Sequence, residues 1–120
     1  MLKIFQVLRI LLACVGLIRF KDNAEFVASL AKPRKLMFLV TAGPVVDKVI
    51  ETFAALLEPG DILIDGGNEW YKFSEERAVR IAEKGIIYMA MGVSGGEYGA
   101  RYGPSIMPGG PKGYPLSFFR

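Results

Sequence analysis

The sequence contains no histidine and a single cysteine, Cys14. Without histidine, a Ser-His-Asp triad and an imidazole general base are excluded. One cysteine excludes a disulfide within the chain and a zinc site built on cysteines, and we expect no metal site. Runs of lysine and arginine are also missing, and the net charge is only +3. Nucleic acid is therefore not an expected partner, whereas a small anionic ligand is compatible with this charge.

Long apolar runs that could cross a membrane are absent as well. In the apolar stretch 1–20 the longest uncharged run, residues 10–18, has nine residues, whereas a membrane-spanning helix needs about 20. We expect no membrane partner and a cytoplasmic location. Residues 1–21 are interpreted as an apolar leader or a first element of uncertain role. Export led by residues 1–20 stays open, because a signal peptide needs only about 7–15 apolar residues.

The residues that are present, 52% hydrophobic and 22% charged in a chain of 120, fit one globular domain. Three short apolar segments predict strands at 35–41, 61–65 and 86–91, and the first two are expected to be buried on both faces. Segments with helical features precede each of them. Alternating helices and strands of this kind predict right-handed βαβ units on a parallel sheet.

The predicted helices carry recognisable end signals. Asp22 is a predicted N-cap, with Glu25 at the spacing of a capping box. Pro44 suits the first turn of the second helix, and Ser74 is predicted to cap the third. Gly85 is expected just beyond the end of that third helix, where glycine accommodates a left-handed backbone.

Glycine-rich loops follow the predicted strands. In an open parallel sheet, ligands bind beyond the carboxyl ends of the strands. The segments 41–43, 65–70 and 92–96 lie there, so we expect the three loops to converge on one crevice. The region 92–110 alone holds seven of the fourteen glycines, and such density indicates unusual turns or close approach to a ligand.

Each loop has a chemical interpretation and a purely structural alternative. The segment 40–44 precedes a helix and could bind an anion, or it is an ordinary turn. Asn68 could both donate and accept hydrogen bonds, or it belongs to a simple turn. Ser94 and the neighbouring backbone N–H groups could hold a carboxylate or a polyol, or they form a tight loop. Arg101 and Lys112 could meet an anionic ligand or stay solvated on the surface.

Two long stretches carry a family resemblance. "KPRKLMFLVTAGPVVDKVIETFAALLEPGDILIDGGNEWY" and "GVSGGEYGARYGPSIMPGG" closely resemble decarboxylating 6-phosphogluconate dehydrogenase, from about Phe26 to Lys112. The resemblance implies an α/β fold, an incomplete Rossmann-like parallel sheet with helices on both faces. It implies that 22–112 form part of an NADP-binding domain and that 113–120 are an irregular tail.

The resemblance also implies an activity, the NADP-dependent oxidative decarboxylation of 6-phosphogluconate to ribulose 5-phosphate in the pentose phosphate pathway. The cofactor-binding residues that it implies are Val40, Thr41, Ala42 and Asn68. The substrate-binding residues that it implies are Asn68, Ser94, Gly95 and Gly96. A homodimer, or pairing with the full-length enzyme, is the implied assembly.

Departures from the family pattern limit these expectations. Thr41 stands where the family usually has lysine, and Tyr98 where it usually has glutamate. The glycine fingerprint of the first βαβ unit is not recognisable, and "GGEYGA" (95–100) is rejected as a substitute because it does not follow the predicted third strand directly. The family's general base and acid belong to a helical domain that this sequence lacks, so no catalytic residue is assigned. We expect an inactive, truncated product or incomplete gene model, or else a non-catalytic binding or regulatory module that pairs with a full-length relative.

Overall fold

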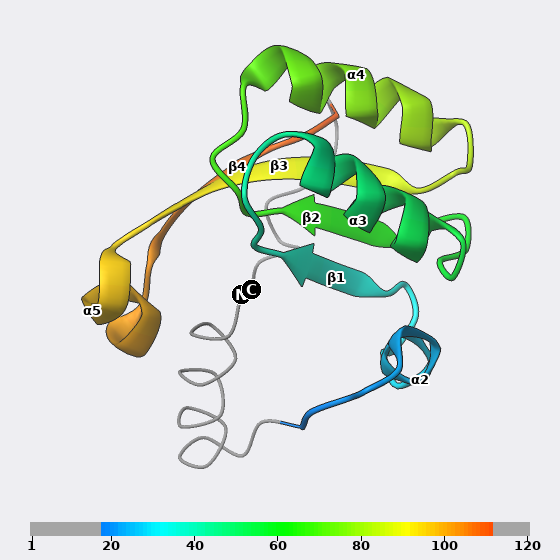
Figure 1. Ribbon diagram of the computed structural model, residues 1–120, viewed down its shortest axis with the longest axis horizontal. Coiled ribbons are helices and arrows are strands. Elements are labelled where there is room, and N and C mark those ends of the chain that lie inside the picture. Colours follow the sequence, from blue (N-terminus) through cyan, green and yellow to red (C-terminus); the bar gives the residue numbers. More distant parts are fainter. Residues whose placement is uncertain (1–17, 112–120) are drawn as a thin grey trace.

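The computed structural model describes residues 18–111 (Figure 1). The predicted leader 1–21 and tail 113–120 therefore lie almost wholly outside the described residues. The elements in chain order are α2 (Asn23–Ala28), β1 (Lys35–Phe38), α3 (Pro44–Ala54), β2 (Ile62–Asp65), α4 (Tyr71–Ala82), β3 (Ile87–Ser94), α5 (Gly96–Tyr102) and β4 (Ser105–Gly109).

Of the three helix starts that the sequence predicts, two are confirmed. The Asp22 side chain accepts hydrogen bonds from the backbone N–H groups of Ala24 and Glu25, at 2.8 and 3.0 Å, so the predicted cap of α2 is confirmed. Pro44 opens α3 as predicted. The prediction that Ser74 caps α4 is wrong, because the extended residue Trp70 is the N-cap and the helix starts at Tyr71. Ser74 is instead a buried residue inside the helix.

Within the described part of the chain, the sheet has four strands in the order β1-β2-β3-β4. The first three are parallel, with Leu36, Leu63 and Tyr88 side by side in the register. This confirms the predicted α/β, Rossmann-like class and its parallel strands. The fourth strand lies in a region that the sequence predicts as a glycine-rich loop, and it runs antiparallel to β3.

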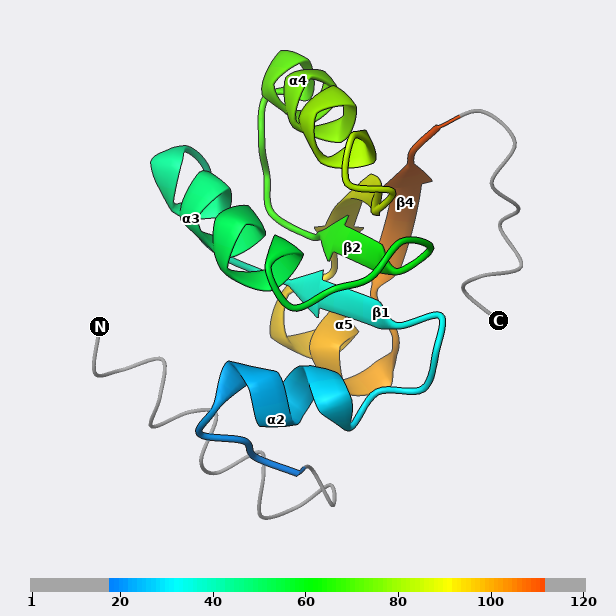
Figure 2. The ribbon, with the colours of Figure 1, turned by 90° about the vertical axis from the view of Figure 1, so that its right-hand side faces the viewer.

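Helices α3 and α4 lie on one face of the sheet. Successive right-handed crossovers that advance in one direction place their connecting helices on the same face. Figure 2 shows α3 and α4 side by side, and residues of both join one apolar cluster, in which Val46 and Ile81 pack with Leu36 and Leu63. The second cluster consists of the strand residues Ile62, Ile64, Met89 and Met91. Helices are expected on both faces of the sheet, but within residues 18–111 they cover one face.

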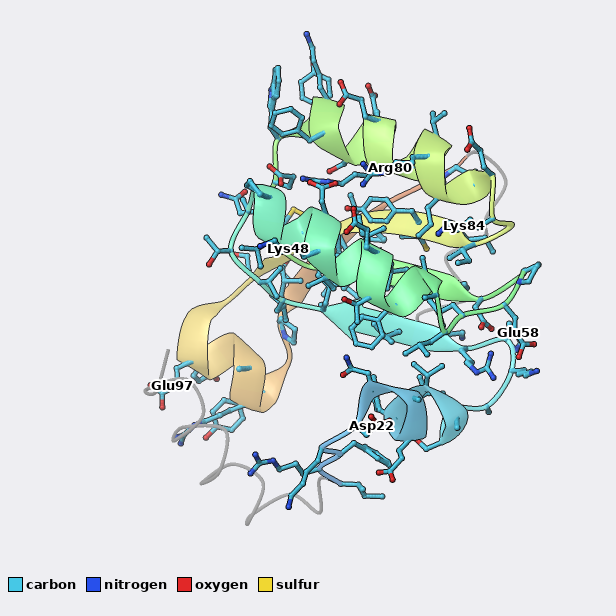
Figure 3. The ribbon with its side chains drawn as sticks, turned by 45° about the vertical axis from the view of Figure 1, so that its right-hand side comes forward. Asp22, Lys48, Glu58, Arg80, Lys84 and Glu97 are labelled. Atoms are coloured by element: carbon cyan, nitrogen blue, oxygen red, sulfur yellow. The ribbon has the colours of Figure 1, made fainter. Side chains whose placement is uncertain are left out.

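Burial along the strands distinguishes the centre of this sheet from its edge. All four residues of β2 are buried, as expected for a central strand. In β1, Lys35 and Met37 are exposed while their neighbours are buried, so the expectation of burial on both faces is wrong for this strand. Among the described strands β1 is an edge, and only one of its faces is covered. At the amino ends of the strands, Arg34 and Asp61 form an ion pair of 2.9 Å close to Glu58, which Figure 3 labels.

Candidate functional site

The loops that follow β1 and β2 touch each other. The Gly66 N–H donates to the Phe38 carbonyl at 2.9 Å, which extends the pairing of the two strands. A β-carbon added at Gly67 would lie only 3.1 Å from the Val40 carbonyl oxygen. Glycine at this position therefore lets the two loop backbones approach closely. The structure thus brings the predicted cofactor loop 40–42 beside the predicted turn around Asn68.

A buried carboxylate shapes the turn before Asn68. Asp65 ends β2 and is 1% exposed. It accepts a hydrogen bond from the Gly67 N–H at 2.9 Å and another from the Tyr88 hydroxyl at 2.7 Å. Burial, reinforced by the bond to Asp65, raises the pKa of Tyr88, so this tyrosine stays a hydrogen-bond donor. The arrangement fixes the backbone that presents Asn68.

The predicted cofactor-side residues are accessible. Thr41, Ala42 and Asn68 are exposed, and Val40 is half-buried. An amide side chain offers two donors and an acceptor, and none of the hydrogen bonds among the described residues engages the side chain of Asn68. These positions can therefore offer polar groups to a ligand.

The amino end of α3 is less open than its sequence suggested. The N-cap is Gly43, whose N–H donates to the Glu69 carboxylate at 2.8 Å. Pro44, the next residue, has no N–H to offer. Glu69 in turn accepts a hydrogen bond from Arg77 at 2.7 Å. Arg77 chiefly, and the Gly43 N–H next, hold the pKa of Glu69 below its usual value. An anion at this helix end would meet a carboxylate that already occupies part of the site.

Sequence reasoning missed Glu69 and Arg77. A signal for Arg77 was present, because it lies three residues after Ser74 and four before Ile81, and all three are buried. This spacing places a charged residue on the inward stripe of α4, where a lone charge needs a partner. Glu69 had no comparable periodic signal, because it lies in a loop.

The third predicted loop lies elsewhere along the sheet. Asp65, the last residue of β2, pairs with Ala90 of β3, but β3 continues to Ser94. Four further residues of strand extend roughly 13 Å. Figure 1 shows α5 at that distant end of β3, apart from α3 and α4. Only two of the three loops therefore converge as expected. The third loop carries Ser94, Gly95 and Gly96, which are all exposed, and it lies further along β3.

The strand that carries the third loop is also longer than predicted. Because β3 reaches Ser94 and α5 begins at Gly96, the segment 95–100 follows the strand directly, which corrects the reason for rejecting "GGEYGA". Gly95 has a φ of 137°, and a β-carbon there would lie 2.9 Å from the Gly99 α-carbon. Glycine is therefore required at Gly95 by the fold itself.

A groove of about 690 Å³ opens beside Asn68, between α4 and the strands β3 and β4. Of the predicted site residues, Asn68 is the only one that lines it. Among the described residues, its charged lining consists of Asp65, Glu69 and Glu75, with no lysine or arginine. Such a lining does not suit a phosphorylated anion. The exposed loop residues, rather than this groove, are the candidate site.

The two cationic residues suggested as contacts for an anionic ligand give the candidate site limited support. Arg101 forms a surface ion pair of 2.9 Å with Glu97 on α5, and Lys112 lies outside the described residues. The described residues contain no cluster of three or more His, Cys, Asp or Glu side chains that could hold a metal ion. Within residues 18–111, no helix combines the length and the apolar character that crossing a bilayer requires.

Comparison with known proteins decides the family. The sequence profile described as the NAD binding domain of 6-phosphogluconate dehydrogenase matches residues 9–114. The chain belongs to this family. Its resemblance to decarboxylating 6-phosphogluconate dehydrogenase is thereby confirmed.

Individual relatives agree with the family assignment. The chain is 52% identical over 101 residues to the decarboxylating 6-phosphogluconate dehydrogenase of Chlamydia pneumoniae, which covers 83% of this chain and 21% of the relative. It is 58% identical over 91 residues to the decarboxylating enzyme 1 of Oryza sativa subsp. japonica, covering 76% of this chain and 19% of the relative. The chain thus spans about a fifth of the length of these relatives.

Solved structures share the observed fold. Plasmodium falciparum 6-phosphogluconate dehydrogenase, solved in its apo form, with NADP+ and with 6-phosphogluconate, is 55% identical with a TM-score of 0.74. The match covers 78% of this chain and 20% of that one. Mycobacterium tuberculosis 3-hydroxyisobutyrate dehydrogenase, at 23% identity and a TM-score of 0.66, shows likeness of fold alone over 78% of this chain and 31% of that one.

Proposed function

We propose that this chain supplies the cofactor-side part of a site for the NADP-dependent oxidative decarboxylation of 6-phosphogluconate to ribulose 5-phosphate. The observation that carries the proposal is the contact between the exposed loop 40–42 and the turn that presents Asn68. It stands in a chain that is 55% identical to a dehydrogenase solved with NADP+ and with 6-phosphogluconate. The proposal extends to the pentose phosphate pathway and to a cytoplasmic location, as the family implies.

The proposed roles follow the accessible groups. The backbone of Val40, Thr41 and Ala42 would lie along NADP, which supplies the hydride acceptor when bound. Asn68 would orient nicotinamide and sugar acid through its amide. Ser94 and the glycines after it would hold the sugar acid. Because Ser94 stands roughly 13 Å along β3 from the Asp65 level, a bound substrate would have to span this distance or rely on other parts of the site.

Turnover is not expected from these residues alone. None of the exposed loop residues is a general acid or base suited to the reaction, and losing such catalysis typically costs 10²–10⁴-fold in rate. Thr41 also brings no positive charge to the cofactor. We therefore propose binding without useful catalysis, in a homodimer or in a pair with a full-length relative.

The test is a ¹H–¹⁵N NMR titration of the 120-residue chain with NADP and then with 6-phosphogluconate. We expect shifts at the amides of 40–43, 67–68 and 94–96, and at the side chain of Asn68. Asn68→Ala should weaken binding about tenfold, as loss of a ligand hydrogen bond does. Asn23→Ala, a change of the only other asparagine, is the matched control on α2. A folded chain whose spectrum ignores both ligands would contradict the proposal.

A further inference from the structure

The side chain of Arg77 lies at the centre of a buried polar cluster that joins α3, α4 and the loop before α4. The Arg77 side chain is 6% exposed, and that of Glu69 is 7% exposed. Arg77 donates to Glu69 at 2.7 Å and to the two Asp47 carboxylate oxygens at 2.8 and 3.2 Å. A further hydrogen bond of 3.2 Å reaches the Gly43 carbonyl. One guanidinium thus links three separate segments of the chain.

The cluster fixes the peptide groups on either side of Gly43. Its N–H donates to the same Glu69 oxygen, Oε2, that accepts from Arg77. Its carbonyl accepts from Arg77 itself. Gly43 has a φ of 102°, in the region that favours glycine. As a glycine, it has no side chain of its own through which it could be held. The end of the loop 40–43 is therefore held by Glu69 and Arg77 together.

The position of this cluster relates to Asn68 directly. Glu69 follows Asn68 in the chain, and Asp65 holds the turn from the other side through the Gly67 N–H. A shift of Glu69 would move both the Asn68 backbone and the end of the cofactor loop. The two halves of the proposed cofactor side are thus coupled through one carboxylate.

Stability alone is a weak reason for this pair. A buried ion pair is often no more stabilising than well-packed apolar residues of similar size. Asp47 also binds Arg80, whose side chain is half exposed, so α3 and α4 have a second ionic link that touches neither loop. Figure 3 shows Arg80 on α4 facing α3. The contacts peculiar to Arg77 are those with Glu69 and Gly43.

We infer that Glu69 and Arg77 are positioning residues that set the spacing between the loop 40–43 and Asn68 for NADP. This inference rests on the proposed function. Neither side chain needs to touch the cofactor. Both act by holding the backbone of the neighbouring loop, and their substitution changes ligand binding through the position of Gly43 and Asn68.

The experiment compares Arg77→Lys and Glu69→Gln with Arg80→Lys in the full chain. Lysine cannot reproduce the planar fork that reaches Glu69, Asp47 and Gly43 together. With its carbonyl oxygen in the place of Oε2, glutamine keeps an acceptor for both the Gly43 N–H and Arg77, but it removes the negative charge that Arg77 pairs with. Arg80→Lys makes the same chemical change at the neighbouring, exposed partner of Asp47. Three readouts are taken: the unfolding free energy, amide hydrogen exchange at Gly43, and the dissociation constant for NADP.

We expect Arg77→Lys and Glu69→Gln to speed exchange at Gly43 and to weaken NADP binding about tenfold. Both should shift the side-chain amide signal of Asn68 even without ligand. Arg80→Lys should leave the dissociation constant within about twofold, within the usual range for a change at an exposed ion pair.

The outcomes separate this inference from the proposed function. If the unmodified chain binds NADP and both variants bind it equally well, the positioning role is overturned while the proposed function stands. If the folded, unmodified chain does not bind NADP, the proposed function fails and the inference fails with it. If both variants are unfolded while Arg80→Lys is folded, the pair is structural and the positioning role is overturned.

Discussion

Asp65 shows what a single residue contributes to this site and how much of that can be foreseen. The sequence "DILID" places a carboxylate at the end of an apolar strand, and that strand is confirmed as β2. Its partner Tyr88 stands 23 residues later, and no local pattern connects the two. The link depends on the register, in which Leu63 pairs with Tyr88 and the tyrosine hydroxyl reaches forward to Asp65. Long-range register is the information that the sequence alone did not supply.

Tyr88→Phe tests this buried pair. The substitution keeps the ring but removes one of the donors to a carboxylate that is 1% exposed. We expect a loss of about 1–3 kcal/mol in the unfolding free energy, because a buried acceptor is left short of a partner. Urea denaturation measures it. Tyr71→Phe removes a hydroxyl from an exposed residue and should change stability by less than about 0.5 kcal/mol. Equal effects of the two substitutions would contradict the account of Asp65.

At the scale of elements, the sequence predicted three strands and the helices between them, but not α5 or β4. Those two occupy a region in which glycine and proline give little local propensity for regular structure. The short helix α5 is bounded by Gly95 and Gly103, both with positive φ. The strand β4 forms because its backbone pairs with β3, from Ala90 opposite Gly109 to Ser94 opposite Ser105. In this region tertiary strand pairing, rather than local propensity, determines the structure.

Gly95→Ala tests how α5 is held. At Gly95 a left-handed backbone coincides with a contact of 2.9 Å between an added β-carbon and Gly99, whereas at Gly96, also of positive φ, nothing lies within 4 Å. Both substitutions strain the backbone, by roughly 1–2 kcal/mol, but only Gly95→Ala also forces α5 to move. We expect faster exchange of the Gly99 and Gly103 amides in Gly95→Ala than in Gly96→Ala. Identical exchange in the two variants would show that the close contact is relieved without cost to the helix.

At the scale of the whole molecule, the candidate site is divided along the sheet. The rule that ligands bind at the carboxyl ends of parallel strands located the loops after β1 and β2 correctly beside each other. It could not locate the third loop, because the rule says nothing of strand length and β3 runs past its neighbours to Ser94. The roles of the loop residues stay predictions, carried by the family and by exposure. Glu69 and Arg77 could not have been paired from sequence, since their contact depends on where α4 begins.

Acid stability of the whole chain should depend on Asp47. Arg77 first, and Arg80 after it, hold the pKa of Asp47 at about 2, below its ordinary value of 3.8. A carboxylate with a depressed folded-state pKa stabilises the fold above the unfolded pKa and loses that contribution as the pH falls through the folded pKa. The contribution is therefore complete near pH 6, begins to fall below about pH 5 and is gone below about pH 2.

Asp47→Asn should accordingly be less stable than the unmodified chain at pH 6, and the difference should shrink steadily toward pH 3. Urea denaturation at pH 6, 5, 4 and 3 gives the two curves. Glu51→Gln, at an exposed position on the same helix, corrects for the general effect of removing one negative charge from α3. A difference between Asp47→Asn and the unmodified chain that stays constant over this range would mean that the Asp47 carboxylate stabilises the fold through its shape and hydrogen bonding rather than through its charge. In that case the ion pairs with Arg77 and Arg80 would not be the source of acid sensitivity, and the remaining paired carboxylates, Glu58, Asp61 and Glu69, would have to account for it.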